Sequence, residues 1–331
     1  MASIAFPTLA KKATLADGTT YGYVTVAPAS ASKPTFLLLH GYPSSSYDWR
    51  HQIEALPKSG YGVLAPDLLG YGDTDKPGDV GCYRMKTMAG HMIELLDIEK
   101  VQSCIAVGHD WGVGLLSRLP TYHTDRFLGI VPISVSYLEP GFVLDADAFN
   151  DMTENAFGYA AYGYWKWHNT EEAVKDCDEN PASVFSLFYP TDPELFKTDL
   201  GPVGKAAAFV TSGQTTASPS WYSTDEQAVR SKIFDKGGYR GPLNWYKAAT
   251  RGVNSADEAE VPPEKKLCLL PTLLIISELD YVARADMQIP RTKEWCPNLR
   301  VKTLDCGHWI QLERPAVVNA LLEEFAAEVC K

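Results

Sequence analysis

The residue of this chain whose type and surroundings most strongly suggest reactivity is an aspartate in a segment with small residues on both sides. It is Asp110, in the segment Val107-Gly108-His109-Asp110-Trp111-Gly112. The apolar run at 103–107 predicts a buried strand, and the stretch at 111–116 predicts the helix that follows. A strand, a tight turn and a helix are the setting of a nucleophile elbow. A carboxylate is already an anion at pH 7, so Asp110 can attack a saturated carbon and form an ester with the protein itself.

A second turn offers groups that stabilise negative charge. The apolar run at 36–39 predicts a strand, which is followed by His40-Gly41-Tyr42-Pro43. Next to a nucleophile elbow, this loop supplies one backbone amide of an oxyanion hole, and the residue after the nucleophile supplies the other. These amides belong to Tyr42 and Trp111. A cis bond before Pro43 would aim the Tyr42 amide, whereas the alternative interpretation is an ordinary Gly-Pro turn.

An acid and a histidine follow the nucleophile in the chain. Asp280 comes after the apolar run at 272–276, and His308 comes just beyond the next predicted strand. A histidine that takes a proton from water must be neutral and oriented, and a carboxylate on its other ring nitrogen secures both. We therefore predict that His308 is a base oriented by Asp280. Glu278 competes for that role, and Asp280 could instead fix a turn.

The elements that must position these residues alternate between strands and helices. An Asp17-Gly18 turn signal predicts a hairpin over 14–26. Continuous apolar runs predict further strands at 61–66, 127–131, 272–276 and 299–304, with helical patterns between them that include 86–96 and 316–329. This alternation predicts an α/β fold with a mostly parallel, doubly wound sheet.

The alternation stops between about residues 138 and 262. This segment is rich in Tyr and Trp and has no β-branched strand runs. We predict that it is a helical cap, or lid, over the carboxyl edge of the sheet. The predicted organisation is therefore a first part of the core at 1–137, a cap at 138–262 and a second part of the core at 263–331.

Composition and charge exclude several classes of partner. The chain has 331 residues, of which 45% are hydrophobic and 21% charged, so it can bury a sizeable core. A net charge of -11 argues against nucleic acid and anionic membranes. No run approaches the roughly 18 apolar residues that a membrane span needs.

The cysteines and the start of the chain predict the compartment. The seven cysteines are scattered and form no CxxC pair, which favours reduced thiols over a disulfide framework. No metal-ligand spacing is present, so we expect no metal. The apolar run before Pro7 is too short for a signal peptide, and we expect a cytoplasmic protein. The sequence leaves open whether the protein is a monomer or a homodimer.

Taken together, these motifs resemble the α/β-hydrolase-fold epoxide hydrolases. The resemblance rests on the 40–43 and 108–112 segments, Asp280 and His308, and it covers nearly the whole chain. It implies that a small apolar epoxide and water are converted to a vicinal diol through an ester on Asp110. It also implies that neither a metal nor an organic cofactor is needed.

In that family two lid tyrosines hold the epoxide oxygen. The stretch at 239–246 resembles the second tyrosine motif and implies this role for Tyr246. The first motif falls within 157–164, where Tyr159 fits best and Tyr162 and Tyr164 are alternatives. Phenols with a pKa near 10 stay protonated at pH 7 and can donate to the alkoxide that forms when the ring opens.

Two other functions compete with this one. Haloalkane and fluoroacetate dehalogenases share the fold and the aspartate. Dehalogenases need N–H donors for a leaving halide, of which Trp111 could be one, and the fluoroacetate enzymes pair the aspartate with an arginine. Tyr42 offers no such side chain, and Trp111 stands in the place of that arginine. The other alternative is a non-catalytic ligand-binding protein that has lost turnover. The complete set of reactive groups argues against this interpretation.

Overall fold

The apolar runs of the sequence form the centre of one twisted sheet. The computed structural model describes residues 2–330, and in this range the sheet has eight strands in the order β1-β2-β4-β3-β5-β6-β7-β8. The first two pairs in this order are antiparallel and the others are parallel. The predicted α/β fold with a mostly parallel sheet is confirmed. The strands are β1 (Ala10–Thr14), β2 (Thr20–Val26), β3 (Thr35–Leu39), β4 (Gly62–Pro66), β5 (Cys104–His109), β6 (Phe127–Ile133), β7 (Thr272–Ser277) and β8 (Leu299–Leu304).

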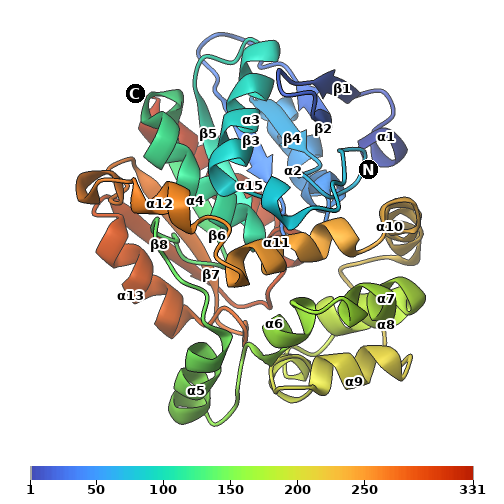
Figure 1. Cartoon of the computed structure of the whole chain (residues 1–331). Coiled ribbons are helices and arrows are strands. Elements are labelled where there is room, and N and C mark those ends of the chain that lie inside the picture. Colours follow the sequence, from blue (N-terminus) through green and yellow to red (C-terminus); the bar gives the residue numbers. More distant parts are fainter. Residues whose placement is uncertain (1, 331) are drawn as a thin grey trace.

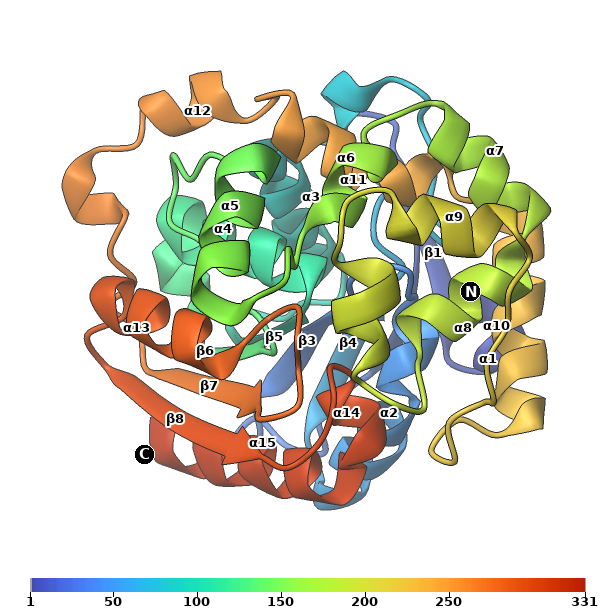
Figure 2. The same cartoon turned by 90° about the horizontal axis from the view of Figure 1, so that it is seen from below.

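Each face of the sheet has its own hydrophobic core. Successive side chains of a strand point to opposite faces, so Phe36 and Leu38 of β3 join one buried cluster and Leu37 and Leu39 join the other. The first face is covered by helices α2 and α15, and the second by α3, α4 and α13 (Figure 2). These helices are α2 (Arg50–Ala55), α3 (Met85–Ile98), α4 (Trp111–His123), α13 (Ala285–Trp295) and α15 (Pro315–Val329); the short α1 (Ala2–Ala5) and α14 (Ile310–Glu313) complete the core.

The hairpin at the start of the chain is longer than its turn signal predicts. The strands β1 and β2 pair from Ala10 opposite Val24 to Thr14 opposite Thr20. The connection therefore runs over residues 15–19 rather than over two residues. Asp17 fixes it by accepting a 2.8 Å hydrogen bond from the Thr19 amide. The pattern located the turn correctly but not its length.

The chain between β6 and β7 is helical throughout its regular elements in the described structure. Most of these helices gather in the lower half of Figure 1, and α11 runs between them and the core. We call residues 138–262 the cap segment. Its helices are α5 (Ala146–Phe157), α6 (Gly163–His168), α7 (Glu172–Glu179), α8 (Pro181–Phe188), α9 (Lys205–Thr211), α10 (Thr224–Gly237), α11 (Arg240–Thr250) and α12 (Ser255–Ala259). Within residues 2–330, no helix is long and apolar enough to cross a membrane.

Two glycines allow β5 and α4 to meet in a sharp turn. A Cβ atom at Gly108 would overlap the backbone of Gly112, and one at Gly112 would overlap the carbonyl oxygen of Leu39. Asp110 lies between them with φ 52° and ψ -124°. A non-glycine residue at positive φ is strained by about 1–3 kcal/mol, so the packing around it must hold it there.

Replacing Gly112 tests this close approach. Gly112→Ala should lower the free energy of unfolding by at least about 3 kcal/mol, the upper end of overpacking costs, because backbone atoms cannot move aside. Gly90→Ala is the matched control, since Gly90 lies in α3 with open space around it. It should raise the free energy of unfolding by about 0.5–1 kcal/mol. Equal stability of the two variants in denaturant titrations would contradict this account of the turn.

Candidate active site

The carboxylate of Asp110 is held by two backbone amides. Its Oδ1 accepts a 2.7 Å hydrogen bond from the Tyr42 amide, and the Trp111 amide also donates to this side chain. A Cβ atom on Gly41 would overlap the carboxylate, so the loop can approach Asp110 only with glycine at that position. The structure therefore brings together the two amides that the sequence predicts as an oxyanion hole.

The loop that carries Tyr42 contains a cis peptide bond, and hydrogen bonds of the His40 side chain hold its conformation. The Tyr42–Pro43 peptide bond is cis. The buried His40 ring donates from Nδ1 to the Gly41 carbonyl and accepts at Nε2 from the Leu68 amide, both at 3.0 Å. Burial lowers the pKa of His40 to about 4, so its ring is neutral at pH 7. His40 thus braces the loop and is not a proton donor at the site.

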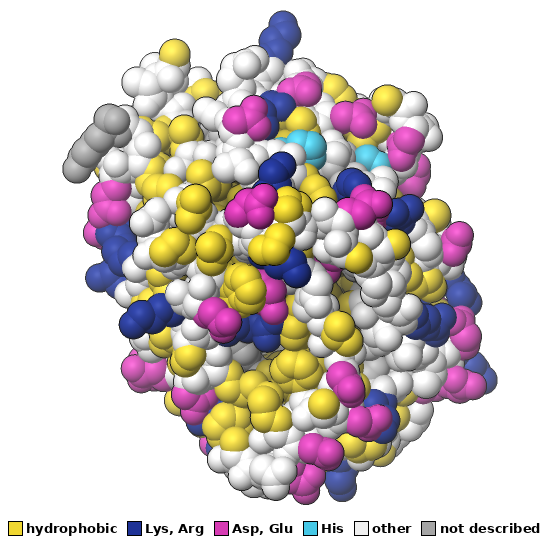
Figure 3. All heavy atoms as spheres, turned by 60° about the vertical axis from the view of Figure 1, so that its left-hand side comes forward, with side chains coloured by type: hydrophobic (Ala, Val, Ile, Leu, Met, Phe, Trp, Pro, Cys, Tyr) yellow, Lys and Arg dark blue, Asp and Glu magenta, His cyan; other side chains and the backbone are white. Residues whose placement is uncertain are grey.

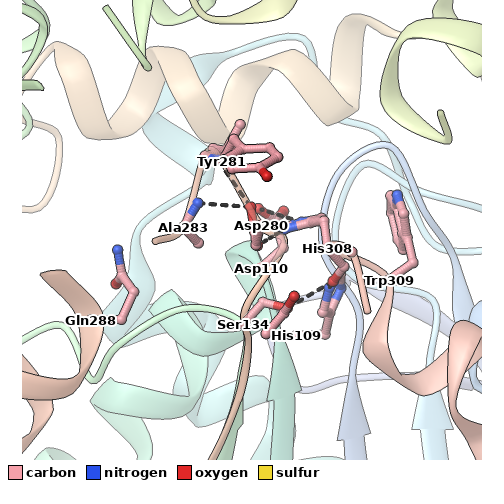
Figure 4. Close-up of polar contacts among 12 residues, drawn as sticks. His109, Asp110, Ser134, Asp280, Tyr281, Ala283, Gln288, His308 and Trp309 are labelled. Carbon is pink, nitrogen blue, oxygen red and sulfur yellow. Dashed lines mark hydrogen bonds and ion pairs between the residues drawn. The ribbon is translucent and has the colours of Figure 1, made fainter. Parts of the chain in front are cut away.

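His308 lies between two carboxylates, as Figure 4 shows. Its Nδ1 is 2.6 Å from Asp280 Oδ2, and its Nε2 faces Asp110 Oδ2 at 3.9 Å, too far for a direct hydrogen bond. The other oxygen of Asp280 accepts from the amides of Val282 and Ala283 at 3.0 and 2.9 Å. Glu278, the competing acid, is exposed to solvent. The geometry therefore favours Asp280 as the partner of His308.

Hydrogen bonds from residues that the sequence did not point to hold the loop that carries His308 in place. The His308 carbonyl accepts from Ser134 Oγ at 2.7 Å and from His109 Nε2 at 2.9 Å. Glu313 accepts from the amides of Gly307 and Trp309, at 2.7 and 3.0 Å, on either side of the histidine. Nothing near Ser134 marks it in the sequence. Glu313 follows His308 by five residues in the sequence, and this closeness is the signal that could have pointed to it.

The pKa values of His308 and Asp110 are both raised, for different reasons. Burial lowers the pKa of His308, but the charge and hydrogen bond of Asp280, together with the charge of Asp110, outweigh it and raise this pKa to about 8. Burial raises the pKa of Asp110 above the usual 3.8, although His308 and the two amides oppose that rise. The unreacted site therefore favours a charged imidazole beside a carboxylate.

Two buried phenols from the cap segment face this carboxylate. Tyr246 lies on α11, with its ring 5.0 Å from that of Trp111, and Tyr164 lies on α6, with its ring 5.9 Å from that of Tyr246. Both line the same cavity as Asp110 and His308. Burial, aided by the charge of Asp110, raises the pKa of each phenol well above 10. Both groups therefore remain O–H donors at neutral pH.

The prediction for Tyr159 does not fit this geometry. Its hydroxyl donates to the Tyr281 carbonyl at 2.8 Å, and its side chain is not among those that line the cavity. The Tyr162 hydroxyl donates to the Val282 carbonyl at 2.9 Å. Helix α5 ends at Phe157 and α6 begins at Gly163, so Tyr159 and Tyr162 lie in the connection and only Tyr164 is presented by α6. Of the three candidates, Tyr164 is the one that meets Tyr246.

The cavity at this site is mostly apolar. Its volume is about 460 Å³, and its walls come from both the core and the cap segment. The apolar lining includes Phe142, Leu144, Phe149, Met152, Trp165 and Val282. Two charged residues at its edge are already paired, Asp286 with Arg284 and Arg291 with Glu139. The arrangement suits an uncharged apolar ligand whose reactive atoms lie at the Asp110 end.

Comparison with known proteins shows the same fold. The family model for the alpha/beta hydrolase fold matches residues 34–315. Epoxide hydrolase A of Mycobacterium tuberculosis is 31% identical over 305 residues, which are 88% of this chain and 90% of that protein. The bifunctional epoxide hydrolase 2 of Rattus norvegicus is 28% identical over 91% of this chain. The chain spans only 54% of that rat protein, about half its length.

Solved structures agree with these sequence matches. An epoxide hydrolase from an endophytic Streptomyces has a TM-score of 0.82 at 27% identity, covering 96% of this chain and 94% of its own. Epoxide hydrolase A from Mycobacterium thermoresistibile has a TM-score of 0.79 at 26% identity, covering 96% of this chain and 98% of its own. The likeness thus extends over the sheet and the cap segment together.

The role of Asp280 in setting the charge of His308 can be measured. In Asp280→Asn the attraction that raises the pKa of His308 is lost while burial remains, so this pKa should fall from about 8 to below the usual 6.5. An NMR titration of the histidine ring protons gives the value. Glu278→Gln removes an exposed acid from the same loop and should leave the pKa unchanged. A His308 pKa still near 8 in Asp280→Asn would show that another group sets it.

Proposed function

The chain belongs to the α/β-hydrolase fold family, and we propose that it is an epoxide hydrolase that converts an epoxide and water to a vicinal diol. One observation carries this proposal. A carboxylate nucleophile, a histidine base and two protonated phenols converge on one apolar cavity. The phenols are what an epoxide requires, because its oxygen leaves as an alkoxide and needs an acid.

In the first step, Asp110 attacks one ring carbon of the epoxide. A new bond forms between a carboxylate oxygen and that carbon, and the carbon–oxygen bond of the ring breaks. Tyr164 and Tyr246 donate hydrogen bonds to the ring oxygen, and one of them gives it a proton. These donors act most strongly when charge develops on the oxygen, so they lower the barrier more than they strengthen binding.

In the second step, water hydrolyses the ester on Asp110. His308 Nε2 takes a proton from water, and the oxygen attacks the carboxyl carbon of Asp110. The amides of Tyr42 and Trp111 then stabilise the oxyanion, each contributing about 3 kcal/mol in comparable sites. When this intermediate collapses, the bond between the Asp110 carboxyl carbon and the diol oxygen breaks, and the diol oxygen takes the proton from His308. The carboxyl proton left on Asp110 returns to the phenol that gave up its proton in the first step. Esterification removes the negative charge of Asp110, which is one of the influences that raise the pKa of His308. The ester therefore makes His308 a neutral base more readily than the free enzyme does.

The cap segment supplies the acid groups and the core supplies the nucleophile and the base. We propose that residues 138–262 act as a lid that closes the cavity from water and shapes it for apolar substrates. Hydrophobic side chains gather in the lower half of the face shown in Figure 3. Val143 and Met152 are 72% and 44% exposed, and Met152 also lines the cavity. An apolar rim of this kind favours entry of an apolar epoxide.

Removing each of the two central residues should separate the two steps. Asp110→Ala should form no ester, whereas His308→Gln should accumulate one because its water is not activated. Intact-protein mass spectrometry after mixing with styrene oxide measures this as a gain of one substrate mass. Both variants should still bind the epoxide. Binding without any mass gain in His308→Gln would contradict the two-step mechanism.

The assignment of the first phenol can be tested by a matched pair of variants. Tyr164→Phe should lower kcat/KM by about 10²-fold, the lower end of the range for loss of a general acid. Tyr159→Phe changes the same group in a residue outside the cavity and should leave kcat/KM unchanged. Kinetics of diol formation under identical conditions compare the two. A larger loss in Tyr159→Phe would restore the assignment that the motif favours.

A further inference from the structure

Two side chains of the cap segment donate hydrogen bonds to one carbonyl group of the loop at 40–43, which carries the Tyr42 amide. The carbonyl oxygen of Pro43 accepts from Tyr189, with its hydroxyl at 2.9 Å, and from Arg230 Nη2 at 3.0 Å. Tyr189 follows the last residue of α8, and Arg230 lies in the middle of α10. Pro43 comes directly after Tyr42, whose amide donates to Asp110. Two cap side chains therefore hold the residue next to the oxyanion-hole donor.

Asp48 of the core anchors the same contact. Its Oδ2 lies 2.7 Å from the hydroxyls of both Ser44 and Tyr189, and its Oδ1 accepts from the Tyr222 hydroxyl at 3.1 Å. The single proton of Tyr189 is thus shared between Asp48 and the Pro43 carbonyl. Asp48 is only 2% exposed. A buried carboxylate with these partners fixes the Tyr189 hydroxyl in place.

Arg230 is held there at a considerable energetic cost. It is 4% exposed, and in the described part of the chain no carboxylate forms an ion pair with it. Its guanidinium carbon lies 4.3 Å from the ring centre of Phe234, 4.9 Å from Tyr189 and 5.3 Å from Phe185. A buried charge without an ionic partner is expensive, and aromatic faces offset only part of that expense. An arginine in this position therefore calls for a function beyond packing.

We propose that Tyr189 and Arg230 are positioning residues that set the place of the Tyr42 amide from the cap segment. The proline ring fixes φ of Pro43, so few free torsions separate the Pro43 carbonyl from the Tyr42 amide. A shift of that carbonyl therefore moves the amide relative to Asp110 Oδ1. A misplaced donor loses much of its value, because hydrogen bonds weaken steeply with distance and angle.

This role affects the two chemical steps unequally, an argument that rests on the proposed function. In the first step Asp110 loses negative charge, so the hydrogen bond from the Tyr42 amide matters less in the transition state than before it. In the second step the same oxygen gains charge, and the amide must be in place to stabilise it. Displacing the amide should therefore slow hydrolysis of the ester and leave its formation nearly unchanged.

The experiment measures both steps in single turnovers. Full-length wild type, Tyr189→Phe and Arg230→Met are mixed with styrene oxide, quenched and analysed by intact mass. Both variants should lose about tenfold in the rate of ester decay, a part of the roughly 10²–10³ that loss of a whole oxyanion donor costs. Their rates of ester formation should match wild type. Arg230→Lys keeps one donor and should fall between Arg230→Met and wild type.

A control on the same helix separates positioning from stability. Glu226 pairs with Arg50 across the boundary between cap and core, with Nε to Oε1 at 2.5 Å, and does not touch Pro43. Glu226→Gln breaks this ion pair but keeps the N-terminal capping of α10. It should leave the ratio of the two rates unchanged. If Arg230→Met does not fold, the isosteric Tyr189→Phe decides the question.

Each outcome has one meaning. Slower ester decay in Tyr189→Phe and Arg230→Met, with a normal ratio in Glu226→Gln, supports the inference. Equal slowing of both steps, or the same effect in Glu226→Gln, overturns it, because the cluster would then only stabilise the fold. Absence of any ester in His308→Gln would instead refute the proposed function. If the ester forms in His308→Gln but decays at the wild-type rate in Tyr189→Phe, the proposed function stands and only the positioning role of Tyr189 and Arg230 is wrong.

Discussion

The site depends on keeping the carboxylate of Asp110 anionic although most of its side chain is buried. Burial alone would drive a proton onto Asp110, and the Tyr42 and Trp111 amides, together with His308, oppose this. The requirement explains why glycine occurs at 41, where the loop approaches the carboxylate, and at 108 and 112, where the turn that carries Asp110 packs against backbone atoms. It also explains the sharp turn, since a regular helix start would point the side chain away from the β3 loop.

The parts of the site that lie in the core were predictable because their signals are local. Buried parallel strands appear as continuous apolar runs, and the residue that follows each run lies at the same edge of the sheet. Asp110, Asp280 and His308 could therefore be placed near one another without any coordinates. The structure brings all three together with Tyr42, and Asp280 differs from the nearby Glu278 mainly in being buried.

The cap segment was less predictable because its meaning depends on packing between distant segments. Three tyrosines fall within a few residues of one another, and the sequence does not show that α5 ends at Phe157 and α6 begins at Gly163, which leaves only Tyr164 on α6. The contact of Ser134 with the His308 loop joins elements 174 residues apart in the sequence. No periodicity or motif in the sequence indicates packing of this kind. The motif therefore favours Tyr159, whereas the geometry of the cavity favours Tyr164. The length of the connection between β1 and β2 could not be predicted for a different reason. The Asp17-Gly18 dipeptide indicates where a turn lies but not how many residues it contains.

The insertion of the cap between β6 and β7 has a consequence for how such a protein could be re-engineered. A foreign lid joined at those two points could bring its own phenols and so a new substrate range. It would also have to bring a hydroxyl and a cation to the carbonyl of Pro43. With the positioning role proposed for Tyr189 and Arg230, a chimera that lacks them would capture its substrate and then release product slowly. Exchange of lids would then be constrained by residues that do not line the cavity.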